Sequence, residues 1–317
     1  MKVLLIYNPN SGNRSFRNHL DGVIEKFQEK GYLVTPWRIN DCCDLPCLFD
    51  KIDRTEYKKV LIAGGDGTIH QVVNALLNNG FDLPIGIYPA GTANDFFNNF
   101  NLPAGAEELT EIYTKDHYAY SDVGMANGEY FINVASFGCL TDVSQKTDPK
   151  IKTNLGVFSY YLKGIEEFQK LRTIRVRVES KDFAYEDEIY FMLIMNGKSA
   201  GGFKKISPGS DVCDGLLDVF IFMKCPVLEF VNLLTKILRG EHTKSPSVYY
   251  FRTDKLTVVC EEETGTDLDG EKGVSFPLEI GIVPKRLKIL QPHRSCRRKN
   301  DREKDSEKKT AIGVRRR

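Results

Sequence analysis

Five residues in the first quarter of the chain have types and spacing suited to binding phosphate: Gly64, Gly65, Asp66, Gly67 and Thr68. They follow the apolar run 60–63, which is typical of a buried parallel strand. They precede residues 69–77, whose apolar positions have helical spacing up to a helix end at Asn78-Asn79-Gly80. The five residues are therefore predicted to form a strand-to-helix turn. Backbone N–H groups and the positive end of the helix face outward at such a turn and attract an anion.

A tight turn that binds nothing is the alternative for these glycines. Asp66 and Thr68 favour a binding site, because they add a charged acceptor and a hydroxyl at the mouth of the turn. The turn is not a P-loop, since no Gly-Lys-Ser/Thr follows it. It also lacks the Gly-x-Gly-x-x-Gly pattern of dinucleotide-binding folds.

Two other predicted strands end in similar polar turns. Residues 83–88 form a short apolar run that continues into Pro89-Ala90-Gly91-Thr92-Ala93-Asn94-Asp95-Phe96. Residues 3–7 form another, followed by Asn8, Pro9, Asn10, Ser11 and Gly12. Three such turns can meet at the carboxyl edge of one parallel sheet, which is where open α/β sheets bind ligands.

Two carboxylate motifs lie in the second half of the chain. Asp211 and Asp214 could hold a hard cation such as Mg²⁺ together with the carbonyl of Leu216. An Asp-Gly turn between strands is the alternative. Further on, Asp269-Gly270-Glu271 follows a polar, turn-rich segment, so we expect Glu271 on an accessible connection. Without further information, Glu271 is explained as an ordinary exposed glutamate in a loop.

Together these motifs resemble the diacylglycerol kinase catalytic family, in particular its bacterial soluble lipid-kinase branch. The resemblance covers residues 1–293, and its motifs have the order and spacing of the family: Asn8-Pro9-x-Ser11-Gly12, Gly64-Gly65-Asp66-Gly67-Thr68, Pro89-x-Gly91-Thr92-x-Asn94-Asp95-Phe96, Asp211-Val212-Cys213-Asp214-Gly215-Leu216-Leu217-Asp218-Val219 and Asp269-Gly270-Glu271. Gly-Gly-Asp-Gly by itself is shared with NAD kinases and phosphofructokinases. The five motifs in sequence are far more specific.

The resemblance implies a kinase that uses ATP and Mg²⁺. Phosphoryl transfer needs phosphates held in line, a divalent ion against their charge and a base near the accepting hydroxyl. The residues expected to bind ATP lie in the three N-terminal turns: Asn8, Pro9, Asn10, Ser11, Gly12, Gly64, Gly65, Asp66, Gly67, Thr68 and Thr92. A structural magnesium is implied at three further residues: Asp211, Asp214 and Leu216.

Asp66 and Glu271 are the residues expected to act in catalysis. Asp66 cannot favourably face phosphate alone, because like charges repel, and Mg²⁺ between them resolves this conflict. A turn-capping carboxylate is the alternative for Asp66. The resemblance implies that Glu271 deprotonates the lipid hydroxyl. A solvated glutamate, with a pKa of about 4.3, is a weak base, so catalysis would need burial or a carboxylate neighbour such as Asp269.

The order of elements predicts two domains. Strands and helices alternate first, which predicts an α/β N-terminal domain with a parallel sheet, like that of NAD kinases and diacylglycerol kinases. From about residue 118 strands dominate, with a hairpin at Asn127-Gly128, and predict a mainly antiparallel β-sandwich C-terminal domain. Helices near 155–170 and 226–239 interrupt it.

The predicted domain limits follow from this change and from the resemblance. The nucleotide-binding α/β domain takes residues 1–122 plus 284–293, because the family's final strand, here 286–290, returns to the first domain. The β-rich lipid-substrate domain takes residues 123–283, including a strand at 276–283. Residues 294–317 form a basic tail with eleven Lys/Arg and four Asp/Glu, which is expected to be disordered.

Composition limits the remaining choices. The chain has 317 residues, a net charge of +1 and no apolar run near the roughly 20 residues of a membrane span. The eight cysteines are expected to be reduced cytosolic thiols, because Cys42, Cys43 and Cys47 have no second pair that would complete a zinc site. The basic tail is either a solvated extension or an electrostatic tether to anionic lipid, and nucleic acid is not expected as a partner.

These observations predict a cytoplasmic, peripherally membrane-associating kinase that transfers the γ-phosphate of ATP to a lipid alcohol, with diacylglycerol as the favoured acceptor. A sphingoid base, a polyprenol or another acylglycerol is the alternative acceptor. NAD kinase and a non-catalytic nucleotide-binding regulator are the competing functions. Exposed edges in the β-rich domain would allow a homodimer.

Overall fold

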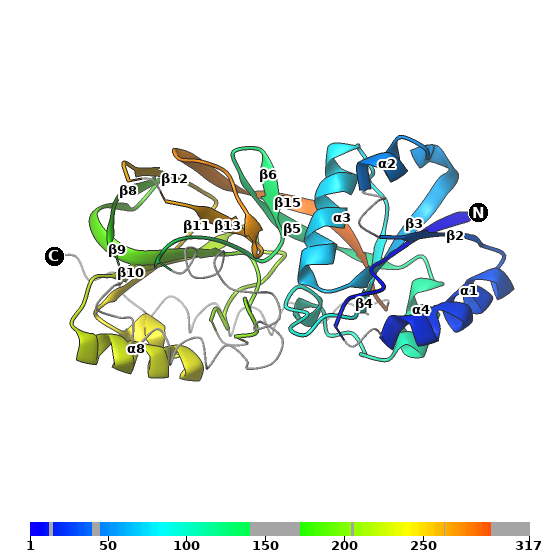
Figure 1. Ribbon diagram of the computed structural model, residues 1–317, viewed down its shortest axis with the longest axis horizontal. Helices are drawn as coiled ribbons and strands as arrows, with labels where there is room; N and C mark the ends of the chain where they lie inside the picture. The colour runs from blue at the N-terminus through cyan, green and yellow to red at the C-terminus, as the bar shows by residue number, and fades with distance from the viewer. Residues whose placement is uncertain (13–14, 40–44, 140–171, 204–205, 263, 293–317) are drawn as a thin grey trace, which may run out of the picture.

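The computed structural model describes residues 1–12, 15–39, 45–139, 172–203, 206–262 and 264–292. Its two halves lie side by side, with the α/β half containing the N-terminus and the β-rich half containing α8 (Val227–Arg239) (Figure 1). The predicted helix near 155–170 and the basic tail lie outside the described residues, as do Cys42 and Cys43. Among the helices of the described ranges, none combines the length and apolar character needed to cross a bilayer.

The α/β half is built on four parallel strands in the order β2-β1-β3-β4: β1 (Lys2–Tyr7), β2 (Leu33–Arg38), β3 (Tyr57–Gly64) and β4 (Ile85–Pro89). Helices cover both faces: α1 (Leu20–Glu29) and α4 (Ala106–Tyr113) on one, α2 (Leu45–Phe49) and α3 (Asp66–Asn78) on the other (Figure 1). The described residues of this half also include three short 3₁₀ helices: Ser15–His19, Arg54–Glu56 and Phe97–Asn99. The central strands β1 and β3 are covered on both faces, which explains their apolar sequences.

Helix α3 forms where the helical spacing predicts it. Its buried side chains recur at three- and four-residue intervals and pack into the core of the α/β half: Ile69, Val72, Val73, Leu76 and Leu77. It begins directly after Gly65, and the chain leaves it through Gly80, which has a left-handed φ of +71°. The strand, glycine turn and helix therefore follow one another as predicted.

The β-rich half consists mainly of antiparallel strands, and two of them form the predicted hairpin at Asn127-Gly128. Its strands are β5 (Tyr118–Ala126), β6 (Glu129–Phe131), β7 (Val134–Gly138), β8 (Ile174–Ser180), β9 (Ala184–Met195), β10 (Leu217–Met223), β11 (Val248–Thr253), β12 (Lys255–Cys260), β13 (Thr266–Leu268) and β14 (Glu271–Lys272). A short 3₁₀ helix, His242–Lys244, follows α8. The predicted fold class, an α/β domain followed by an antiparallel β-sandwich domain, is confirmed.

One long strand joins the two halves. β15 (Leu278–Leu290) pairs with β12 in the β-rich half and, at Ile289, with β4 of the parallel sheet. The sequence predicted two separate strands here, 276–283 and 286–290. Instead, β15 runs continuously beside β5, with a bulge between Val283 and Leu287. The bulge lies where the predicted domain boundary falls, and the boundary itself stays a prediction.

Candidate active site

The three polar turns predicted from the sequence lie together at the carboxyl edge of the parallel sheet. The Asn8 N–H donates to the Ala63 carbonyl at 2.9 Å, and the Ala90 N–H donates to the Gly64 carbonyl at 3.0 Å. Their backbones are so close that a Cβ on Gly91 would lie only 2.5 Å from the Cα of Gly65. Glycine is thus required at this contact, since a real Cβ essentially never approaches that closely.

Side chains join the turn at residues 8–12, the first of the three in the chain, to the second turn at residues 64–68. Asn8 donates from Nδ2 to Thr68 Oγ1 at 3.2 Å, and its Oδ1 accepts from the Asn10 N–H at 2.9 Å. The Ser11 N–H donates to the Asn8 carbonyl, while Pro9 is buried beneath the turn. Gly12 has a left-handed φ of +51°, and a Cβ there would lie 2.2 Å from the Ala90 oxygen. The structure therefore brings the residues of this turn against the other two.

The start of α3 offers backbone donors that the helix itself does not use, beside these turns. Its first helical hydrogen bond runs from the Ile69 N–H to the Gly65 carbonyl. The N–H groups of the three residues before Ile69 therefore have no acceptor within the helix. Thr68 is buried in the first turn of α3, and Thr92 is exposed on the third polar turn. This edge can bind an anion through backbone donors and a helix N-terminus.

Two aspartates lie close to these donors. Asp66 accepts the Phe96 N–H at 3.0 Å. Burial raises the pKa of Asp66, and the charges of Asp95 and Asp269 add to this effect against the backbone hydrogen bonds. Asp95 is 4% exposed, and its Oδ2 accepts the Gly202 N–H at 3.0 Å. Its Oδ1 has no hydrogen-bond partner among the described residues, so a buried carboxylate oxygen is left available to a cation.

The β-rich half contributes Glu271 to the same place. Glu271 opens the short strand β14 and is exposed, as predicted for an accessible connection. Its Oε1 lies 3.3 Å from the position that a Cβ on Gly67 would take. A carboxylate from the second half therefore lies directly above the first turn of α3.

Asp269 does not stand beside Glu271 as a free carboxylate. Its two oxygens accept the N–H groups of Ile132, Asn133 and Val134 at 2.7–2.9 Å, and its side chain is 1% exposed. Asp269 thus holds the β13–β14 turn against the start of β7. No local pattern indicates this role of Asp269, because its backbone partners lie more than 130 residues earlier in the chain.

The predicted structural magnesium residues lie on an exposed turn before β10. Asp211 accepts the Cys213 N–H at 3.2 Å, and Asp214 accepts the Leu216 N–H at 3.1 Å. The other oxygen of Asp214 forms an ion pair with Arg252. A cation on this turn would therefore share Asp214 with a guanidinium group.

This turn is also connected to the strand that joins the two halves. Asp122, buried in β5, accepts the Gly215 N–H at 2.8 Å and the Lys285 N–H at 2.6 Å. Lys285 lies in the β15 bulge and has a left-handed φ of +54°. One carboxylate therefore binds both the turn and the bulge.

Metal ligation at either place needs donors besides side chains. Within the described residues there is no cluster of three or more His, Cys, Asp or Glu that could hold a metal ion. Mg²⁺ commonly binds through one or two carboxylates, with phosphate and water completing its shell. The donor set around Asp66 and Asp95 suits that kind of site.

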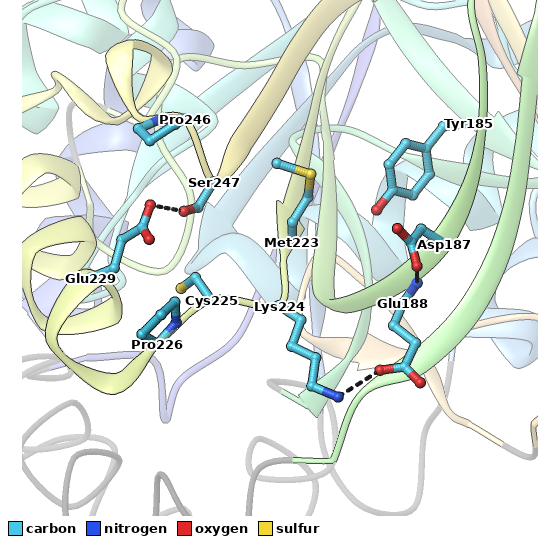
Figure 2. A pocket seen from close by; sticks show the side chains of 10 residues that line it. All are labelled: Tyr185, Asp187, Glu188, Met223, Lys224, Cys225, Pro226, Glu229, Pro246 and Ser247. Atoms are coloured by element: carbon cyan, nitrogen blue, oxygen red, sulfur yellow. Dashed lines mark hydrogen bonds and ion pairs between the residues drawn. The ribbon is translucent and has the colours of Figure 1, made fainter.

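A separate hollow lies in the β-rich half. It has a volume of about 510 Å³ and lies between β9, the end of β10 and the start of α8 (Figure 2). Lys224 forms an ion pair with Glu188 at its rim, and Glu229 accepts a hydrogen bond from Ser247 (Figure 2). None of the residues of the three polar turns lines it.

Comparison with known proteins decides the family. The model of the diacylglycerol kinase catalytic domain matches residues 2–126, and that of the YegS C-terminal NAD kinase beta sandwich-like domain matches residues 133–291. The diacylglycerol kinase of Bacillus subtilis (strain 168) is 33% identical over 95% of this chain and 99% of its own length. The chain belongs to the diacylglycerol kinase family. It is therefore a kinase.

Other members of the diacylglycerol kinase family agree. The diacylglycerol kinase of Staphylococcus carnosus (strain TM300) is 31% identical over 92% of this chain and 95% of that protein. The crystal structure of a diacylglycerol kinase from Bacillus anthracis str. Sterne superposes with a TM-score of 0.75 and 26% identity. The superposition covers 92% of this chain and 97% of the Bacillus anthracis chain. The match extends over both halves, so the convergence of Glu271 with the N-terminal turns lies within the shared fold.

Proposed function

We propose that this chain is an ATP-dependent lipid kinase that transfers the γ-phosphate to a lipid alcohol, with diacylglycerol as the acceptor and phosphatidic acid as the product. The observation that carries the proposal is the meeting of Glu271 with the first turn of α3, across the two halves of the molecule. It combines a phosphate-binding edge with a carboxylate base. The names of the curated relatives support diacylglycerol as the acceptor.

The phosphates of ATP would lie against the backbone donors at the start of α3. The hydroxyls of Thr68 and Thr92 would add donors, and the turn at residues 8–12 would contact the rest of the nucleotide. Because Asp66 and Asp95 are acidic, phosphate alone would be repelled at this edge. These two residues would hold Mg²⁺, which when bound neutralises charge on the phosphates.

Glu271 would act as the general base. It would accept the proton of the lipid hydroxyl as that oxygen bonds to the γ-phosphorus. The bond between the γ-phosphorus and the oxygen bridging to the β-phosphate breaks, and ADP leaves with that electron pair. Glu271 is exposed, so an acceptor can reach it from outside.

Three further expectations belong to this proposal. A second Mg²⁺ would bind Asp211, Asp214 and the carbonyl of Leu216, and would share Asp214 with Arg252. The acceptor would be met at a membrane surface, where the basic residues 294–317 would be attracted to anionic lipid. β11 pairs only with β10 in the described sheet, which leaves an edge where a second copy could add.

The test compares the wild type with Glu271→Gln. Each protein is incubated with radiolabelled ATP, Mg²⁺ and mixed micelles containing diacylglycerol, and the extracted lipid is counted. Glu261→Gln is the matched control, because Glu261 is another exposed glutamate of the β-rich half. We expect labelled phosphatidic acid from the wild type and the control, and a loss of about 10²–10⁴-fold in Glu271→Gln.

Two results would count against the proposal. Full activity in Glu271→Gln would remove Glu271 as the base. A wild type that labels neither diacylglycerol nor a panel of sphingoid, polyprenol and acylglycerol acceptors would refute the lipid kinase function. Formation of NADP⁺ from NAD⁺ in the same assay would then establish NAD kinase activity instead.

A further inference from the structure

Helix α3 is held against the β-rich half by two side chains one helical turn apart. His70 Nδ1 lies 2.8 Å from Asp269 Oδ2. Asn74 bonds both backbone groups of Tyr130 in β6, donating to its carbonyl at 2.9 Å and accepting its N–H at 3.1 Å. Residues four apart share one face of a helix, so both contacts lie on the same side of α3.

Asp269 is a rigid partner for His70. Three backbone N–H groups of its own half already fix its carboxylate, and its N–H donates to the Val134 carbonyl at 2.9 Å. Its φ of +56° fits the tight turn before Gly270, whose N–H donates to Asp267 Oδ1 at 2.7 Å. His70 is the donor that reaches this carboxylate from the other half. The contact therefore ties α3 to a preformed turn.

The same turn carries Glu271, two residues beyond Asp269. The same helix carries Asp66, one turn before His70, and its first turn contains Gly67, the glycine that Glu271 approaches. A shift of His70 relative to Asp269 would therefore shift Glu271 relative to the N-terminus of α3. No other imidazole or ammonium group is recorded in contact with Asp269 among the described residues.

We propose that His70 is a positioning residue, which sets the distance between the phosphate-binding end of α3 and the Glu271 carboxylate by its bond to Asp269. The inference rests on the proposed kinase function for its kinetic test. His70 touches none of the reacting groups and acts through Asp269. Its chemistry also makes the link sensitive to pH, because a protonated imidazole donates a stronger, charge-assisted hydrogen bond.

The charged groups around His70 favour that protonated form. Burial lowers the pKa of His70, but the hydrogen bond and charge of Asp269 outweigh it, and the net pKa is raised. Glu271 and Asp267 add to the rise. All three carboxylates lie on or beside the β13–β14 turn. From β6 the helix meets the backbone of Tyr130, and on α3 itself His70 adjoins the neutral Asn74.

The kinetic test uses His70→Ala and the conservative His70→Gln, with His117→Gln as a matched control. His117 is an exposed histidine directly before β5. For His70→Ala we expect kcat to fall on the order of tenfold to 10²-fold, with the KM for ATP near that of the wild type. His70→Gln should recover part of the loss, because its amide can still donate to Asp269. The control should match the wild type.

The pH profile separates positioning from a purely structural role. The raised pKa means that the link is strongest below that pKa and weakens as pH rises through it. Wild-type kcat should therefore decline on the alkaline side with a step that is absent in His70→Gln. Identical pH profiles of kcat in the wild type and His70→Gln would overturn the proposal. A loss of kcat in His70→Ala that is fully matched by a fall in Tm would overturn it as well.

A second readout does not depend on catalysis. The His70 ring resonance, assigned by its absence in His70→Gln, is followed by NMR through a pH titration of the full chain. We expect its midpoint above the ordinary value of about 6.5, and a lower midpoint in Asp269→Asn. An unchanged midpoint in Asp269→Asn overturns the link. If the wild type phosphorylates no lipid, the proposed function fails, while this titration still decides the His70–Asp269 contact.

Discussion

The contact between the turn at residues 64–68 and the turn at residues 89–96 gives the most direct test of the candidate site. In Gly91→Ala the new Cβ would lie 2.5 Å from the Cα of Gly65 and 2.9 Å from Asn94 Oδ1. Carbon atoms in ordinary contact are about 3.5–4.0 Å apart. The two turns must therefore separate by roughly 1 Å. Since Gly65 directly precedes α3, the separation moves the N-terminal end of the helix, where we propose that phosphate binds, away from the turn at residues 89–96.

The size of the effect follows from this displacement. Forcing an extra carbon into a packed contact costs about 1–3 kcal/mol of stability. A misplacement of about 1 Å at a reacting site can cost on the order of 10²-fold in rate. We therefore expect a modest loss of stability and a much larger loss of kinase activity. Gly65→Ala should have a smaller effect, because its Cβ would lie 3.1 Å from the Cα of Gly91.

Urea unfolding measures the stability, the radiolabelled-ATP lipid assay measures the kinase activity, and calorimetric titration with Mg·ATP measures nucleotide binding. Gly22→Ala is the control, because Gly22 lies in α1 with nothing within 4 Å of an added Cβ. It should gain about 0.5–1 kcal/mol of stability and keep its affinity for ATP. If Gly91→Ala binds ATP and transfers phosphate as well as the wild type, the close approach of the two turns has no part in the site.

Two other predictions concern stability. Lys59 is buried beneath α4, and its ammonium group donates to the carbonyls of Tyr113 and Lys115 at 2.8 and 2.9 Å. Lys59→Met should lose about 3 kcal/mol in urea unfolding, because acceptors are left unpaired; an unchanged midpoint would contradict this. His242 is fully buried against Phe220, and burial lowers its pKa. The unfolded chain therefore binds a proton at His242 more readily than the folded chain does. As the pH drops below about 6.5, the free energy of unfolding falls by up to about 1.4 kcal/mol per pH unit. His242→Phe should lack this fall in the free energy of unfolding between pH 7.5 and 5.5. An equal pH dependence in the wild type and the variant would refute the prediction.

Local patterns predicted most of the fold, because they contain their own start and stop signals. The helical run predicted over 69–77 lies within α3, and the hairpin at Asn127-Gly128 pairs Ala126 with Glu129. The sequence did not predict β15 as one continuous strand, because residues 284–286 resemble a break between two strands. Their conformation depends instead on Asp122 of β5, which accepts the Lys285 N–H.

The candidate site was predicted in its parts and not in its connections. The motifs identified the turns, and the family resemblance selected Glu271 from other exposed glutamates. The roles of Asp269 and His70 had no local signal, because the groups they bond lie more than 130 residues away in the chain. Arg252 is similar, since only the folded sheet brings it to Asp214.

The electrostatics of the site follow from how its carboxylates are held. Asp66, Asp95 and Asp269 each accept backbone N–H groups, so their negative charges are stabilised mainly by amide dipoles. His70 is the basic side chain recorded at Asp269, and it serves the junction between the halves. A phosphate arriving at the α3 N-terminus would thus meet favourable backbone donors and unfavourable carboxylates at once. The balance favours phosphate together with a divalent cation over phosphate alone, which is the form in which kinases use nucleotide.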